Sequence, residues 1–155
     1  IMEKIFEDHL SKIQADMVSI ALEYIEHRAD EIYIYTANED GITAFDVLYK
    51  INGTIVEKEN INSALKTGEP KYDTSENRMN SMLDIGLDDL EALEEKCNEF
   101  NQEVPSEMRI HYVVKSNEMR AKLRYDKVFS GDAELTPGHI FDSWVQSITQ
   151  GNSAL

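Results

Sequence analysis

The chain has little of what many functional classes require. Its 155 residues include one cysteine, three prolines and seven glycines. A single cysteine, Cys97, cannot form an internal disulfide, which fits a reducing compartment. The low proline and glycine contents exclude collagen-like and low-complexity chains. No apolar run reaches the roughly 18–20 residues that a membrane-spanning helix needs. No signal peptide is evident either, so we expect a cytoplasmic protein with no membrane contact.

Basic residues are also scarce, because 15 Lys and Arg stand against 30 Asp and Glu, for a net charge of -15. A phosphate backbone needs a basic surface, so direct binding of nucleic acid is disfavoured. The imbalance is concentrated in residues 73–103, which carry ten acidic and two basic residues. Such a segment is either a solvated helix face or a docking surface for a basic partner.

The pattern of apolar residues predicts a single α+β domain over residues 1–155. Apolar residues from Met2 to Ile25 recur at three- and four-residue spacing, which predicts a long helix over 3–28. Runs of β-branched and aromatic residues predict strands, and Asn52-Gly53 is a strong hairpin turn signal. The predicted elements that follow the first helix are a strand over 31–37, a turn over 38–41, strands over 42–51 and 54–57, a short helix over 59–65 and an exposed loop over 66–80.

A second helix is predicted to begin near 84–88 and to run to about residue 102. Its apolar stripe includes Cys97, which we therefore interpret as a core residue. Asp88, Asp89 and Glu91 are placed in its early turns, where the helix macrodipole favours negative charge.

A second hairpin follows, with strands over 107–115 and 118–127. Its exposed face is basic, and cross-strand or helix-to-sheet ion pairs are expected to neutralise it. Thr136-Pro137 is typical of a helix start, and residues 151–155 are expected to be frayed. The expected architecture is two antiparallel β-hairpins forming a sheet, packed by a long N-terminal helix, a central acidic helix and a C-terminal helix.

The sequence contains no clear motif for chemistry. The four histidines show no metal-ligand spacing, and there is no nucleophile elbow, phosphate-binding glycine loop or EF-hand. Adjacent acids such as Asp88 and Asp89, or Glu94 and Glu95, point to different sides of a helix and cannot share a proton. We therefore expect no catalytic residue, no metal site and no cofactor, and a protein that is not an enzyme.

The order of elements and certain residues resemble a known family. The matching features are the long first helix, the strand Ile32-Tyr33-Ile34-Tyr35, the Asp40-Gly41 turn, the acidic helix with Leu90, Leu93 and Phe100, the Val104-Pro105 break, the strand residues Met108-Arg109-Ile110 and Leu123-Arg124-Tyr125-Asp126, and Trp144 in the last helix. In these features the chain resembles the YezG-like immunity (antitoxin) family of bacterial polymorphic toxin systems. The resemblance implies a cytoplasmic inhibitor that binds a cognate toxin domain, typically a nuclease.

Charge density predicts where such a partner would bind. A nuclease is basic around its substrate groove, so an acidic protein can be steered to it. The residues predicted to bind the toxin are Asp84, Asp88, Asp89, Glu91, Glu94 and Glu95, with Glu39 and Asp40 of the predicted turn. The alternatives are a non-enzymatic acidic interaction module, a DNA-mimic inhibitor, an immunity protein of contact-dependent inhibition, and an enzyme or ligand binder with scattered site residues. A homodimer also remains possible on these grounds.

Overall fold

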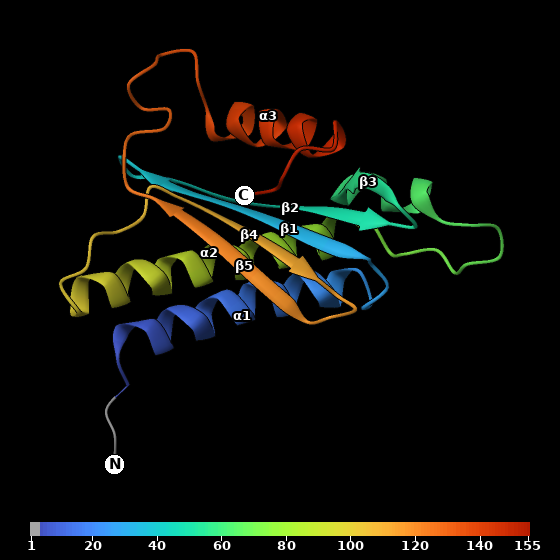
Figure 1. Cartoon of the computed structure of the whole chain (residues 1–155), viewed down its shortest axis with the longest axis horizontal. Coiled ribbons are helices and arrows are strands. Elements are labelled where there is room, and N and C mark those ends of the chain that lie inside the picture. Colours follow the sequence, from blue (N-terminus) through green and yellow to red (C-terminus); the bar gives the residue numbers. More distant parts are fainter. Residues whose placement is uncertain (1–3) are drawn as a thin grey trace.

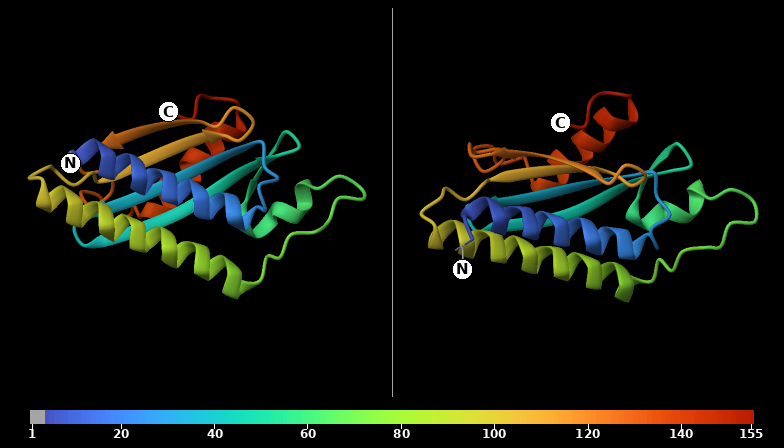
Figure 2. Two further views of the ribbon diagram at one scale, coloured as in Figure 1. Left: turned by 90° about the horizontal axis from the view of Figure 1, so that it is seen from below. Right: turned by 60° about the horizontal axis from the view of Figure 1, so that its bottom comes forward.

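The computed structural model of the chain describes residues 4–155 and has three layers (Figure 1). A five-stranded antiparallel sheet has the strand order β3-β2-β1-β4-β5. Helices α1 and α2 cover one face of the sheet, and α3 covers the other (Figures 1 and 2). The predicted α+β fold is therefore confirmed. The elements are α1 (Phe6–Tyr24), β1 (Glu31–Glu39), β2 (Ile42–Ile51), β3 (Thr54–Glu57), the 3-10 helix η1 (Lys58–Ala64), α2 (Glu76–Glu99), β4 (Glu107–Val113), β5 (Glu118–Arg124) and α3 (Pro137–Thr149).

The central strand β1 divides its side chains between two hydrophobic cores. Ile32 and Ile34 are buried beneath α1 and α2, whereas Tyr33 and Tyr35 are buried beneath α3. Successive side chains of a strand point to opposite faces, so a strand covered on both sides is apolar throughout. The two halves of the sheet meet where β1 pairs with β4, a contact between residues far apart in sequence.

The helix boundaries differ from the predicted ones. Helix α1 ends at Tyr24 rather than near residue 28, because Glu26 and His27 adopt positive φ angles of 54° and 59°. Met2, which we placed on the apolar stripe of this helix, lies outside the described residues. Helix α2 begins at Glu76, well before the predicted start near 84–88. The loop predicted over 66–80 therefore ends at residue 75.

Arg78 explains the early start of α2. Its guanidinium donates hydrogen bonds of 2.9 Å and 2.7 Å to the carbonyl oxygens of Glu23 and Tyr24 at the end of α1. The Glu23 carbonyl also accepts a 3.1 Å hydrogen bond from the Glu26 N–H. Arg78 adds a donor to both carbonyls at the end of α1 while it fixes the first turn of α2. The first turn of α2 has a polar sequence because a polar side chain, Arg78, makes its contact with α1.

The remaining predictions for the second half are mostly confirmed. The Thr136 side chain caps α3 by accepting a hydrogen bond of 3.2 Å from the His139 backbone N–H, with Pro137 at the first helical position. Cys97 is fully buried in the core below α2, and burial raises the pKa of its thiol. The prediction of a frayed tail over 151–155 is wrong in part, because the Ala154 carbonyl accepts a 2.9 Å hydrogen bond from Trp144 Nε1.

Candidate functional site

Four of the predicted site residues lie on one face of α2. Asp84, Asp88, Glu91 and Glu95 are all exposed, and their spacing of four, three and four residues places them in a row along the helix. We call these four residues the acidic stripe. The opposite face of α2 is buried against the sheet, so the acidic stripe points away from the molecule.

The macrodipole does not explain these charges. Because α2 begins at Glu76, the acidic stripe starts only in the third turn, and the predicted placement in the early turns is wrong. The dipole effect falls off within the first turn. Like charges three or four residues apart instead destabilise a helix by a few tenths of a kcal/mol per pair. The acidic stripe therefore costs helix stability, which favours a role in binding over a role in folding.

The other two predicted residues of α2 point elsewhere. Glu94 lies half-buried on one flank of the helix, near the core residue Cys97. Asp89 lies on the opposite flank and faces α1. Neither side chain continues the acidic stripe, so the residues predicted from charge density lie on three different faces of the helix.

Glu39 is buried, so its side chain is not available for the toxin contact predicted for it. It belongs to the end of β1 rather than to a turn, and its side chain is 6% exposed. Its carboxylate accepts hydrogen bonds from the backbone N–H groups of Val128, Phe129 and Ser130, the last two at 3.1 Å and 2.8 Å. Burial raises the pKa of Glu39, but these three bonds outweigh burial and lower it. Glu39 therefore anchors the loop after β5.

Asp40 is the exposed residue of this predicted turn. The turn itself is shorter than expected and consists of Asp40 and Gly41, with φ angles of 50° and 79°. The Asp40 carboxylate lies 3.7 Å from the Lys127 ammonium, and both side chains are well exposed. The pair is therefore weak, and it leaves Asp40 accessible at the end of the sheet near which α2 also ends (Figure 1).

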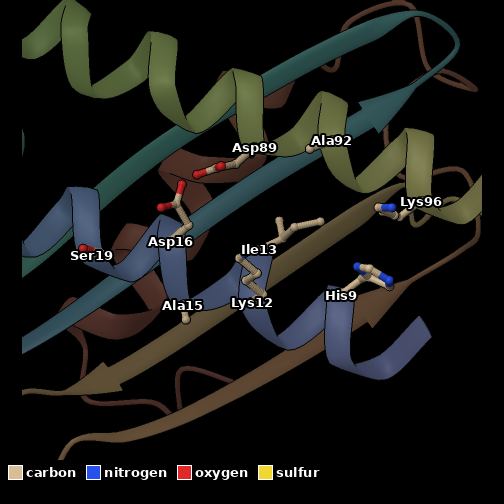
Figure 3. Close-up of a pocket in the computed structure, with 9 residues that line it drawn as sticks. All are labelled: His9, Lys12, Ile13, Ala15, Asp16, Ser19, Asp89, Ala92 and Lys96. Atoms are coloured by element: carbon tan, nitrogen blue, oxygen red, sulfur yellow. The ribbon is translucent and has the colours of Figure 1, made fainter. Parts of the chain in front are cut away.

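A groove of about 560 Å³ lies between α1 and α2 (Figure 3). The carboxylates of Asp16 from α1 and Asp89 from α2 point toward one another inside it. The Oδ2 atom of Asp89 is buried and has no hydrogen-bond partner among the described residues. The pair is not evident in the sequence, because Asp16 and Asp89 lie on different helices and far apart in the chain.

The surroundings of Asp89 favour the protonated form of its carboxyl group. Burial, the facing carboxylate of Asp16 and the charge of Asp88 together raise the pKa of Asp89 from 3.8 to about 8. Since this pKa is higher in the folded state than in the unfolded chain, the associated stability is fully present below pH 4. It is lost as the pH rises toward 8.

This linkage gives a prediction for the Asp89→Asn variant. Asparagine removes the charge, so the variant is expected to exceed the original chain in unfolding free energy by about 1–2 kcal/mol at pH 9, after solvent screening. The two proteins are expected to be equally stable near pH 4. Urea unfolding at both pH values measures the difference. The control is Asp88→Asn, and an equal gain in this control would contradict the assignment to the pair.

The basic face of the second hairpin is partly neutralised, mainly by acidic residues of the strands and their flanks rather than by the helices. Arg109 lies 3.3 Å from Glu107 and sits over the Trp144 ring, with its guanidinium carbon 5.2 Å from the centroid. His111 contacts Glu31 at 2.6 Å and stacks on the Tyr33 ring. Arg120 pairs with Glu118 and Arg124 pairs with Asp126. These contacts place most of the basic groups in internal pairs, which disfavours nucleic-acid binding at this face.

Two features of the described residues bear on other functional classes. Within residues 4–155, no group of three or more His, Cys, Asp or Glu side chains is placed to hold a metal ion. In the same range, no helix combines the length and apolar character needed to cross a bilayer. Comparison with known proteins adds no assignment, since no protein-family model and no curated protein matches the chain.

Proposed function

We propose that this protein is an immunity protein that neutralises a bacterial toxin domain with a basic surface, such as a nuclease, by binding it through the acidic stripe. The observation that carries the proposal is the stripe itself, in which four exposed carboxylates form one row in the middle of a helix that they destabilise. The resemblance to the YezG-like immunity family supports the same function, as does the acidic composition.

Electrostatics explains how such an inhibitor would act. With a net charge of -15, the protein attracts a basic partner over long range and orients it toward its most negative face. An inhibitor that covers a substrate groove needs no reactive group of its own. The row of carboxylates shares its negative charge with the substrate of a nuclease. The proposal does not require that the spacing of the carboxylates match that of DNA phosphates.

The proposed function is tested by co-expression with candidate toxin domains, with cell survival as the readout. We expect survival with the cognate toxin and a stable complex on co-purification. The function is contradicted if the protein rescues cells from none of the toxin domains encoded beside its gene.

The acidic stripe is tested by the double variant Asp88→Lys with Glu95→Lys. The association rate with the toxin is expected to fall about tenfold or more at low salt and to depend less on ionic strength. The matched control is Glu134→Lys with Asp142→Lys, because it changes the same charge at exposed positions in and before α3. If both doubles slow association equally, overall charge acts and the acidic stripe is not the binding face.

A further inference from the structure

The groove between α1 and α2 has a defined shape and two chemically different ends. The aromatic ring of Phe100 packs against Phe6 and His9 where α2 ends, and Arg78 joins the helices where α2 begins. Between these contacts the groove is open, with Ile13, Ala15 and Ala92 among its walls (Figure 3).

The charges of the groove are separated along its length. The Asp16 and Asp89 carboxylates lie toward one end, and the His9 and Lys96 side chains lie toward the other (Figure 3). Lys96 is paired with Glu99 at 2.9 Å, outside the acid pair. Lys12 also lines the groove. Within residues 4–155, neither Asp16 nor Asp89 has an ion-pair partner.

The buried Oδ2 atom of Asp89 has no hydrogen-bond donor among the described residues. An unsatisfied buried carboxylate oxygen costs free energy, and two facing carboxylates add repulsion. In the free protein, a proton on Asp89, whose pKa is raised to about 8, relieves part of this cost. A cation from a partner could take the place of this proton, and the flanking apolar walls would contact its hydrocarbon stem.

We propose that this groove receives a single arginine side chain of the basic partner, with its guanidinium between Asp16 and Asp89. A guanidinium presents several N–H donors in a planar fork and is more weakly hydrated than an ammonium, so it suits two facing carboxylates better than lysine does. Lys12 and Lys96 also line the groove, and their ammonium groups disfavour a polybasic segment along its whole length. This inference rests on the proposed function and names the anchor of the same partner.

The acidic stripe and the groove then have different tasks. The exposed stripe attracts the basic surface, whereas the groove selects one side chain with a particular shape. Partly buried charge contacts mainly slow dissociation, and exposed ones mainly speed association. Variants of Asp16 or Asp89 are therefore expected to raise the dissociation rate with the toxin, in contrast to variants of the acidic stripe.

The test uses the whole chain and blocked arginine, N-acetyl-arginine amide, followed by NMR at pH 7 and pH 9. We expect weak saturable binding, with a dissociation constant of about 1–10 mM, and shifts at Ile13, Ser19 and Ala92. Binding is expected to tighten at pH 9, because the competing proton is gone. Asp89→Asn and Asp16→Asn should each weaken it about fivefold or more, and the exposed-carboxylate control Glu91→Gln should not.

Three results would overturn the inference. The first is the absence of saturable shifts in the groove. The second is equal binding of N-acetyl-lysine amide, which would remove the preference for a guanidinium. The third is a groove filled by a second copy of the chain, seen as concentration-dependent shifts without probe. The NMR readout needs no toxin. If the arginine probe fails to bind, the co-expression test of function still stands. If co-expression fails, probe binding to the groove can still be interpreted.

Discussion

Replacing Gly86 with valine is expected to lower the unfolding free energy by about 3–5 kcal/mol. Gly86 lies on the buried face of α2, where a Cβ atom would overlap the aromatic ring of Phe45 on β2. The ring is itself enclosed in the core, so helix and strand must separate to accept a side chain. Chemical denaturation followed by circular dichroism measures the loss.

A graded series separates this overlap from helix propensity. Gly86→Ala gains about 1 kcal/mol of intrinsic helix propensity but still places a Cβ against Phe45, and we expect a net loss. Ser81→Val introduces a β-branched residue at an exposed position of the same helix and is expected to cost less than 1 kcal/mol. If Gly86→Ala stabilises the protein, the close approach of α2 to β2 is wrong.

Replacing Glu39 with alanine is expected to cost about 3 kcal/mol, because three buried or part-buried backbone N–H groups lose their acceptor at once. The loop after β5 depends on these bonds. In the variant, the loop amides should therefore exchange with solvent faster than in the original chain, and the sheet amides should change less. Hydrogen exchange at residues 128–130 and thermal unfolding measure the local and global effects. The control is the exposed neighbour Asp40→Ala, for which little change is expected.

The Glu39 contribution also has a pH dependence of definite sign. Its pKa in the folded protein lies below the ordinary value of 4.5, so its stabilisation is complete above that value. It is lost as the pH falls through the folded pKa. The stability difference between the original chain and Glu39→Ala should therefore shrink below about pH 4. A difference that grows on acidification would contradict the assigned role.

Local sequence patterns predicted most of the secondary structure but not the partners of polar residues. Charge density pointed to this helix, but it did not separate the exposed row of Asp84, Asp88, Glu91 and Glu95 from Asp89 and Glu94. The first turns of α2 escaped prediction because a polar contact through Arg78, rather than an apolar stripe, fixes them. Propensity and periodicity report on local burial, and they carry little information about such long-range polar contacts.

The errors in the predicted site residues have the same physical origin. Glu39 stands in an Asn-Glu-Asp-Gly run that is typical of a turn, and its backbone partners lie about 90 residues away in sequence. Asp89 follows Asp88 directly, yet its important neighbour is Asp16 on another helix. In both cases the function of the carboxylate depends on which distant segment is packed beside it.

The close packing of α2 on the sheet determines how the acidic stripe meets a partner. Gly86 holds the middle of the helix against Phe45, Arg78 joins its beginning to α1, and Phe100 closes its end against Phe6. A helix restrained at three points would enter the proposed complex with its conformation already fixed. Association then loses little backbone entropy, and the carboxylates act as a preorganised array.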